Sequence, residues 1–230
     1  MADWIFFDCF NTLIDDFDAT GDESGLGSLP LLAVELGAVA RRDEFLAAYR
    51  QVRPSNAPPH LETDLETRLR AVVAQGARLG PDAAAQVVRH LLLRWHEEYE
   101  PALRLTPGVP EMLEHWAGKK RFGVISNFYM AGYPQRYLER FGIAQHFEFV
   151  IDSAAFGERK PGPRIFEEAL RRAGCSPAQV TFIGDRLDLD IEPSHALGMH
   201  PIHLNRGADR PHEPATPAGF ASIQHWREFR

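Results

Sequence analysis

The chain of 230 residues contains only two cysteines and three lysines. Cys9 and Cys175 are far apart, and neither belongs to a CxxC pair, so we expect neither a disulfide framework nor a cysteine-based zinc site. Clustered basic residues are lacking too, and the formal net charge is −7. Because a nucleic-acid-binding face needs clustered Lys and Arg, we expect no nucleic-acid partner.

Long hydrophobic runs are also missing. The N-terminal apolar run Trp4–Phe7 has no basic region before it and is too short for a signal peptide. The longest other apolar stretch, 29–40, is interrupted by Glu35, so no segment is expected to span a membrane. These features favour a cytoplasmic protein without a membrane partner. The sequence carries no signal for the oligomeric state.

Short apolar runs rich in β-branched and aromatic residues recur along most of the chain. Their length and composition are typical of strands buried on both faces, as in a parallel sheet. The predicted strands are Trp4–Phe7, Phe122–Ile125, Phe147–Ile151, Val180–Ile183 and Pro201–Leu204.

Helical periodicity lies between these predicted strands. Gly142, Gly174 and Gly198 follow three of the segments, at the position where a glycine often ends a helix. Alternating strands and helices predict right-handed βαβ crossovers and an α/β fold with a doubly wound, Rossmann-like parallel sheet. The predicted helices are Val109–Trp116, Tyr133–Phe141, Pro163–Ala173 and Asp190–Leu197.

A different pattern occupies residues 16–103. Apolar residues recur there at helical spacing, prolines punctuate the pattern, and no convincing strand appears. We therefore predict an all-helical cap domain at 16–103 inserted into a core formed by residues 1–15 and 104–230. The Pro- and His-rich segment 206–217 indicates a surface loop.

Compact polar groups follow four segments at the expected carboxyl edge of the sheet, where open parallel sheets bind ligands. They include Asp8 and Thr12, then Ser126-Asn127, then Lys160-Pro161, and finally Gly184-Asp185 with Asp190. An Asp or Ser at a strand end is by itself often only a turn or helix-cap residue. The coincidence of four such groups favours an active site.

These segments resemble, in order and spacing, the four motifs of the haloacid dehalogenase (HAD) superfamily. Phe6-Phe7-Asp8-x-x-x-Thr12 resembles the first motif, with Asp8 at the nucleophile position. Ser126-Asn127 resembles the second, Lys160-Pro161 the third, and Gly184-Asp185-x-x-x-x-Asp190 the fourth. The helical insertion after the first motif resembles the helical cap of the family.

The resemblance implies a hydrolase of small anionic substrates. Asp8 would form a covalent ester, which splits one difficult step into two. Asp8, the Phe10 carbonyl and Asp185 would bind Mg²⁺, with support from Asp190. The remaining predicted catalytic residues are Lys160, Ser126, Asn127 and Thr12. Lys160 would neutralise charge, Ser126 and backbone N–H groups near it would hold the transferring group, and Thr12 would orient the first loop.

Phe10 departs from the phosphatase pattern. Phosphatases of the superfamily usually carry a second Asp two residues after the nucleophile, as general acid and base. The 2-haloacid dehalogenases have an aromatic residue there, but their fourth motif is less acidic and binds no metal. This sequence therefore combines a dehalogenase-like first motif with a phosphatase-like fourth motif.

Three functions stay open. The leading hypothesis is Mg²⁺-dependent cleavage of a small phosphorylated metabolite. A metal-independent 2-haloacid dehalogenase and a catalytically weak ligand-binding protein are the alternatives. The cap has no lysine, which excludes a Schiff-base mechanism of phosphonate cleavage as far as the resemblance goes. Other cap residues that we considered as contributors to the site are Arg41, Arg42, His60 and His96.

Overall fold

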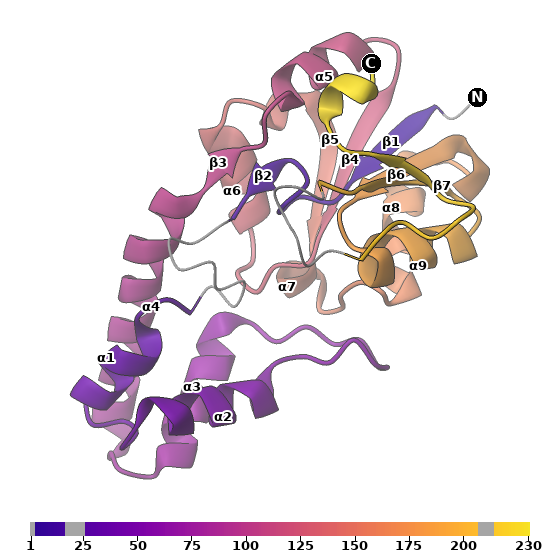
Figure 1. Ribbon diagram of the computed structural model, residues 1–230. Helices are drawn as coiled ribbons and strands as arrows, with labels where there is room; N and C mark the ends of the chain where they lie inside the picture. The colour runs from indigo at the N-terminus through magenta and orange to yellow at the C-terminus, as the bar shows by residue number, and fades with distance from the viewer. Residues whose placement is uncertain (1–2, 17–25, 207–213) are drawn as a thin grey trace. The chain divides into compact units, whose positions relative to one another are not determined.

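Six parallel strands form the central sheet of the computed structural model, in the order β5-β4-β1-β6-β7-β8 (Figure 1). The α/β fold and the parallel sheet expected from the sequence are confirmed. Five strands match the predicted segments to within one or two residues, whereas β8 was not predicted. Their bounds are β1 Trp4–Phe7, β4 Arg121–Ser126, β5 Phe147–Asp152, β6 Val180–Gly184, β7 His200–Leu204 and β8 Ala221–Ile223.

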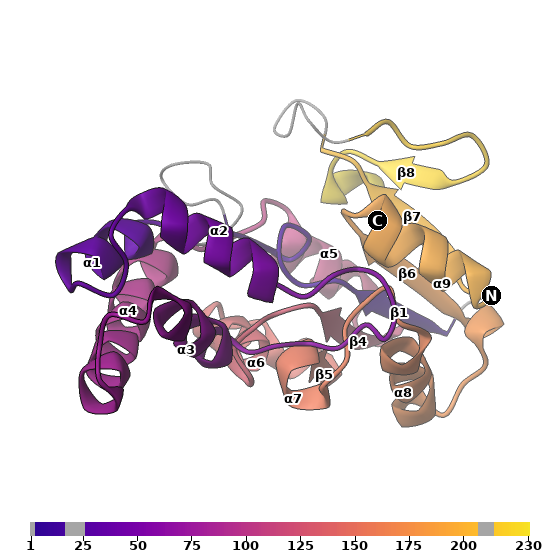
Figure 2. The same cartoon turned by 90° about the horizontal axis from the view of Figure 1, so that it is seen from below.

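Both faces of the sheet are covered, which explains why β1 is apolar at every position. Trp4 and Phe6 pack in one hydrophobic cluster with Phe166 of α8 (Pro163–Ala173). Side chains alternate along a strand, so Phe7 points to the opposite face. There its ring meets the ring of Trp226 at a centroid distance of 5.8 Å. Figure 2 shows α5 and α8 on opposite sides of the strands.

Shorter helices complete this part of the chain. Gly174 ends α8 in a left-handed conformation, as the sequence predicted. The predicted helix 190–197 differs in its first turn, because residues 187–191 form a π-helical turn before a shorter α-helix. The elements are α5 Val109–Trp116, α6 Tyr133–Arg140, η1 Ala144–His146, α7 Ser153–Phe156, η2 Pro177–Gln179, η3 Leu187–Ile191, α9 Glu192–Ala196 and η4 Trp226–Glu228.

The structure describes residues 3–16, 26–206 and 214–230, and the chain divides into two units. The α/β unit comprises Met1–Asp15, Asn56–Glu62 and Leu105–Arg230, and the helical unit comprises Asp16–Ser55 and Thr63–Arg104. The sequence-based division places 56–62 in the cap, whereas their contacts in the structure are with the α/β unit. Residues 207–213 of the predicted surface loop lie outside the described ranges.

The helical unit contains α1 (Leu29–Glu35), α2 (Arg42–Val52), α3 (Leu65–Gly76) and α4 (Pro81–Ala102). Many of its apolar residues at helical spacing are buried, including Phe45, Leu69, Val73, Leu91 and Trp95, whereas Leu31 and Leu93 are exposed. Asp64 caps α3 by accepting a hydrogen bond from the Thr67 N–H at 2.8 Å.

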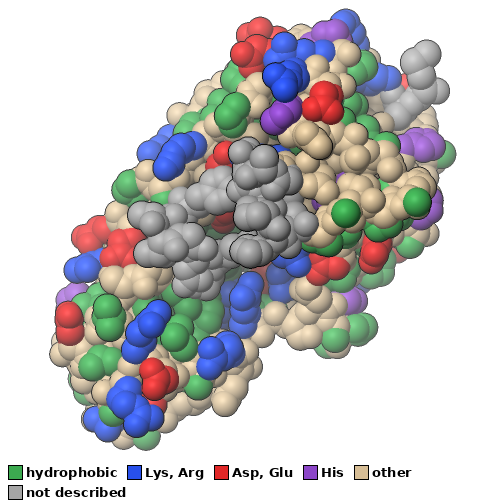
Figure 3. All heavy atoms as spheres, viewed as in Figure 1, with side chains coloured by type: hydrophobic (Ala, Val, Ile, Leu, Met, Phe, Trp, Pro, Cys, Tyr) green, Lys and Arg blue, Asp and Glu red, His purple; other side chains and the backbone are tan. Residues whose placement is uncertain are grey.

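Two short strands, β2 (Ile14–Asp15) and β3 (Arg104–Leu105), form a separate two-stranded sheet where the chain leaves and re-enters the α/β unit. On the face shown in Figure 3, Lys and Arg side chains are interspersed with Asp and Glu. Within the described ranges, no helix has both the length and the apolar character needed to cross a bilayer.

Candidate active site

The turn after β1 holds Asp8 in an almost closed environment. Its backbone N–H donates to the Ile183 carbonyl at 2.9 Å, and only 7% of the residue is exposed. Thr12 Oγ1 donates to Asp8 Oδ2 at 3.1 Å. Asn11 between them has a φ of 63°, a left-handed conformation that Asn adopts more readily than most residues. The turn therefore brings the Thr12 hydroxyl back to the Asp8 carboxylate.

Ser126 ends β4 with a hydroxyl that is completely buried. Among the residues that the structure describes, its Oγ finds no hydrogen-bond partner. A buried polar atom without a partner costs about 1–3 kcal/mol, so such an atom needs an explanation. A bound substrate oxygen would supply the missing partner, and the role of Ser126 at the transferring group stays a prediction.

Asn127 joins the second motif to the third. Its Nδ2 donates to the carbonyl of Lys160 at 2.9 Å, and its Oδ1 accepts from the backbone N–H of Lys160 at 2.8 Å. This pair of hydrogen bonds fixes the backbone of Lys160 against the end of β4. Asn127 is thus placed to hold the lysine.

Lys160 is the buried cation of the site, with 1% of its surface exposed. Its Nζ lies 2.6 Å from Asp8 Oδ1 and 2.6 Å from Asp190 Oδ1. Burial alone would lower the pKa of Lys160, but the charges of Asp190 and Asp8 outweigh burial and raise this pKa above its ordinary value. The side chain therefore stays protonated over the whole physiological pH range.

Asp185 and Asp190 follow β6 and are both buried. Besides Lys160, Asp190 binds the backbone N–H of Arg186, which lies 3.0 Å from its Oδ2. Burial raises the pKa of Asp190, and the negative charge of Asp8 adds to this effect against the opposing charge of Lys160. A side chain at Gly184 would come within 2.5 Å of the Asp190 carboxylate, so the glycine of this motif is needed for the close approach.

The donor set fits a magnesium ion. Carboxylate oxygens of Asp8, Asp185 and Asp190 lie within 4.8 Å of one another. Mg²⁺ takes oxygen ligands, usually one or two carboxylates together with water and phosphate oxygens. Asp8 and Asp185 could hold the ion directly while Asp190 supports them. The Phe10 carbonyl stays a predicted ligand.

Phe10 stands two residues after Asp8, where phosphatases of the superfamily usually carry the Asp that donates a proton. Its ring is packed against other aromatic rings. The ring stacks on Phe128 at a centroid distance of 4.3 Å and meets Tyr137 edge-on at 6.2 Å. Only 8% of Phe10 is exposed. The aromatic residue of the first motif is therefore part of an aromatic cluster beside the nucleophile.

A second polar network supports the motifs and was not predicted. Glu62, whose side chain is 2% exposed, accepts a hydrogen bond from Ser153 Oγ at 2.7 Å and lies 3.5 Å from the guanidinium of Arg159. Ser153 Oγ also accepts from the backbone N–H of Phe128 at 2.9 Å. Glu62 thus connects the residue after Asn127 with the residue before Lys160. No local sequence pattern indicates these contacts.

The other cap residues considered from the sequence belong to different units. Arg41 and Arg42 are exposed at the start of α2, and His96 lies on α4, all in the helical unit. His60 belongs to the α/β unit, where its carbonyl accepts from the Arg159 N–H at 2.9 Å. His60 is thus beside the third motif, although no contact with Asp8 is established for it.

A second buried ion pair also escaped prediction. Asp15 pairs with Arg206 and accepts a hydrogen bond from Thr106 Oγ1 at 2.7 Å. The three residues come from segments far apart in the sequence. Their contacts join the start of the return segment to the end of β7.

The chain is similar to known hydrolases. Residues 2–198 match the family model described as haloacid dehalogenase-like hydrolase. A glyceraldehyde 3-phosphate phosphatase of Methanopyrus kandleri is 32% identical over 139 residues, which cover 60% of this chain and 59% of that protein. A phosphoserine phosphatase of Thermus thermophilus is 31% identical over 114 residues, covering 48% of this chain and 45% of the relative.

Solved structures share the fold over a longer range. A 2-haloacid dehalogenase from Pseudomonas syringae pv. Tomato has a TM-score of 0.75 at 24% identity, covering 99% of this chain and 96% of that one. A HAD phosphatase from Thermococcus onnurineus has a TM-score of 0.66 at 21% identity, covering 99% and 95%. The family match, the parallel sheet and the four strand-end motifs lead to one conclusion: this chain belongs to the haloacid dehalogenase-like hydrolases.

Proposed function

We propose that this hydrolase cleaves a small phosphorylated metabolite with Mg²⁺ and forms an aspartyl-phosphate on Asp8. The observation that carries the proposal is the gathering of the Asp8, Asp185 and Asp190 carboxylates within 4.8 Å, against the single ammonium group of Lys160. The three carboxylates concentrate negative charge at the place where an anionic substrate would bind. A bound Mg²⁺ would neutralise this charge and stabilise the charge of the transferring group.

The chain's own residues divide the work. Two hydrogen bonds orient the Asp8 carboxylate: Thr12 donates to Oδ2, and Lys160 donates to Oδ1. A carboxylate oxygen of Asp8 attacks phosphorus, and the bond from phosphorus to the leaving oxygen breaks with its electron pair. A water molecule then attacks the aspartyl-phosphate, which releases phosphate and restores the carboxylate.

Phe10 sets the class of leaving group that this reaction favours. An alkoxide must take up a proton as it leaves, and a positioned acid contributes about 10²–10⁴-fold to the rate. The stacked ring of Phe10 cannot donate that proton. We therefore expect acyl phosphates and aryl phosphates to react faster than alkyl phosphates.

The relatives support a phosphorylated substrate but name alkyl esters. The names of two of them specify glyceraldehyde 3-phosphate and phosphoserine as substrates. Because the chain covers 59% and 45% of their lengths, the identity of the substrate is left to experiment. The test is a panel of acetyl phosphate, p-nitrophenyl phosphate, glyceraldehyde 3-phosphate and phosphoserine, assayed for phosphate release with Mg²⁺ and with EDTA.

The expected outcome is turnover of at least one of these esters that EDTA removes and Asp8→Asn abolishes. Mass spectrometry of the acid-quenched enzyme should find phosphate on the peptide that contains Asp8. Turnover that persists in EDTA, or in Asp8→Asn, would overturn the proposal.

Metal binding can be measured apart from turnover. Asp185→Asn removes a buried carboxylate of the proposed metal site, whereas Asp188→Asn removes an exposed one from the same loop. Calorimetric titration with Mg²⁺ should show affinity reduced at least about tenfold by the first change, since even outer-sphere partners of metal ligands contribute that much. The second variant should bind as the wild type does. Equal binding by both variants would place the ion elsewhere.

The second candidate function is metal-independent 2-haloacid dehalogenation, which Phe10 favours because a halide leaves without a proton. Asp8 would attack C2 of the haloacid, the halide would depart with the bonding electrons, and water would hydrolyse the resulting ester. Chloride release from 2-chloropropionate in EDTA would support this function. Absence of chloride release with and without Mg²⁺ would exclude it for this substrate class.

A further inference from the structure

Trp226 in η4 brings the C-terminal segment into contact with the nucleophile turn. Its indole Nε1 donates to the carbonyl of Thr12 at 3.1 Å. Thr12 in turn donates its hydroxyl to Asp8 Oδ2 at 3.1 Å. Trp226 is 1% exposed and is separated from Thr12 by 214 positions, so this contact exists only in the folded chain.

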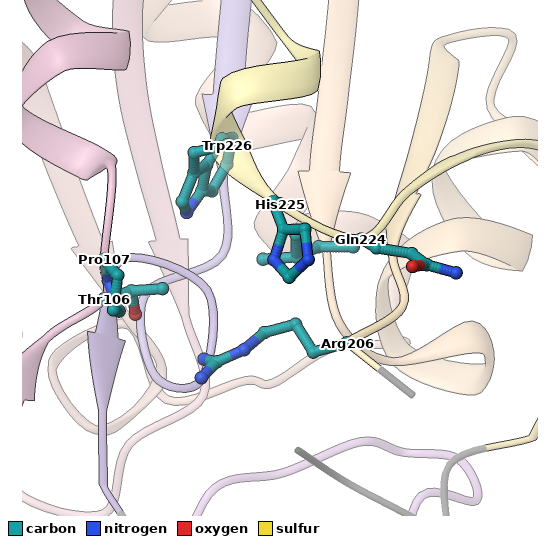
Figure 4. A pocket seen from close by; sticks show the side chains of 7 residues that line it. Thr106, Pro107, Arg206, Gln224, His225 and Trp226 are labelled. Atoms are coloured by element: carbon teal, nitrogen blue, oxygen red, sulfur yellow. The ribbon is translucent and has the colours of Figure 1, made fainter. Parts of the chain in front are cut away.

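The same indole also contacts Phe7, the residue before Asp8 in the chain. The Trp226 ring packs edge-to-face on Phe7 at 5.8 Å between centroids and an interplanar angle of 61°. Trp226 therefore contacts the chain both before and after the nucleophile. In Figure 4, Trp226 lines a small pocket together with Thr106, Pro107, Arg206 and His225.

Trp226 is itself firmly placed. The backbone N–H of His225 donates to Glu228 Oε1 at 3.1 Å, which caps η4. Gly108 packs closely against Trp226: a Cβ atom added at Gly108 would lie 3.2 Å from the Cβ of Trp226. A rigid donor aimed at the Thr12 carbonyl can limit the motion of the turn, and small displacements of a reacting group reduce rates strongly.

From this geometry we propose that Trp226 is a positioning residue for Asp8, acting through the backbone of Thr12. The inference rests on the proposed role of Asp8 as nucleophile. Trp226 does not touch the reacting atoms. Its contribution is to keep the Thr12 hydroxyl, and hence the Asp8 carboxylate, in the orientation for attack.

The test replaces Trp226 by Phe, which keeps an aromatic ring against Phe7 and removes the N–H. The chain offers a matched control in the same region. Trp116 donates its Nε1 to the carbonyl of Phe229 at 2.9 Å, so Trp116→Phe removes the same kind of hydrogen bond from the C-terminal segment without a direct contact to the Asp8 turn. Each variant is assayed for kcat and KM with acetyl phosphate and Mg²⁺, and with 2-chloropropionate.

We expect Trp226→Phe to lower kcat about tenfold with KM nearly unchanged, since misplacement of a catalytic group acts on the chemical step. Trp116→Phe should leave both constants at the wild-type values. Equal kcat in the two variants, or a decrease in Trp226→Phe that the fraction of unfolded protein explains, would overturn the inference.

A second measurement does not depend on turnover. Hydrogen exchange of the peptide covering residues 8–14 should be faster in Trp226→Phe than in the wild type and unchanged in Trp116→Phe, since the Leu13 and Ile14 amides bond to the Cys9 carbonyl within this turn. If the wild type turns over none of the four phosphate esters of the panel, the proposed function fails, while hydrogen exchange still tests the contact of Trp226 with the turn. Unchanged exchange in Trp226→Phe would refute the positioning role in either case.

Discussion

Lys160 and Asp8 are 152 positions apart in the sequence, yet the ammonium Nζ of Lys160 lies 2.6 Å from Oδ1 of Asp8 in a buried contact. The same ammonium binds Asp190 at 2.6 Å. One cation therefore lies between two carboxylates that would otherwise repel each other. This arrangement connects the proposed nucleophile of the first motif to the acidic fourth motif.

Removal of this cation should damage both activity and stability. Lys160→Met leaves Asp8 and Asp190 buried without their counter-charge, and loss of one partner of a buried pair costs about 3–5 kcal/mol. Removal of a group that stabilises transition-state charge should lower kcat by about 10²–10³-fold. Urea unfolding and phosphate release measure the two effects. As a control, Lys119→Met at an exposed position should change stability by no more than about 0.5 kcal/mol.

The pH dependence of stability should report on Asp190. Burial raises the pKa of Asp190 from 3.8 to about 6. Between these values the folded protein holds a proton that the unfolded chain has released, so the contribution of Asp190 is present at low pH and is lost as pH rises through about 6. Asp190→Asn abolishes this titration.

The measurement is thermal unfolding of the metal-free protein in EDTA between pH 4 and 6. This range lies between the ordinary pKa of Asp190 and its raised pKa in the folded protein. Over this range, the Tm of Asp190→Asn relative to wild type should increase with pH. Asp188→Asn, an exposed change in the same turn, should show a constant difference. A difference for Asp190→Asn that stays constant or decreases would contradict the raised pKa.

Phe10→Asp should restore a proton donor near the leaving group. The ratio of glyceraldehyde 3-phosphate turnover to acetyl phosphate turnover should rise by about 10²-fold, the lower end of the effect of a positioned acid. The ratio is independent of the folded fraction, which matters because the change removes a buried stacked ring and costs about 3–5 kcal/mol. Phe10→Leu, which loses the ring without gaining an acid, should leave the ratio unchanged. If the ratio rose equally in both variants, the wild-type preference for acetyl phosphate would be due to the volume of the Phe10 ring and not to the missing proton donor.

Glu62→Gln should weaken the network that connects the second and third motifs. The amide can still accept from Ser153, but it lacks the charge opposite Arg159. We expect the free energy of unfolding to fall by about 3 kcal/mol, because the pair is largely buried. We also expect a lower kcat, because Lys160 would be displaced.

Glu148→Gln provides the comparison, since Glu148 pairs with Arg121 at 2.6 Å on the exposed surface. Loss of this ion pair should lower the free energy of unfolding by less than about 1 kcal/mol, as for other exposed ion pairs. Chemical denaturation of both variants and of the wild type gives the two values. Equal losses would mean that the burial of Glu62 adds nothing to the strength of its contacts.

Much of the fold could be predicted because its signals are local. Runs such as Trp4–Phe7 and Val180–Gly184 are apolar at nearly every position, which indicates strands covered on both faces. β8 has no comparable run, and two of its three residues are exposed, so periodicity gave no signal for it. The π-helical turn 187–191 was missed for a different reason, since its residues also suit an α-helix.

The sequence by itself determined that Asp8, Ser126 and Asp185 come at the carboxyl ends of strands of one parallel sheet. Lys160 follows the short helix α7 and reaches Asp8 only in the folded chain. Only the tertiary structure decided how these side chains are held there. The contacts of Trp226 with Thr12 and of Glu62 with Ser153 join residues separated by 214 and 91 positions. Such pairs arise from packing between distant segments, which leaves no periodicity in the chain and becomes visible only when the segments are folded together.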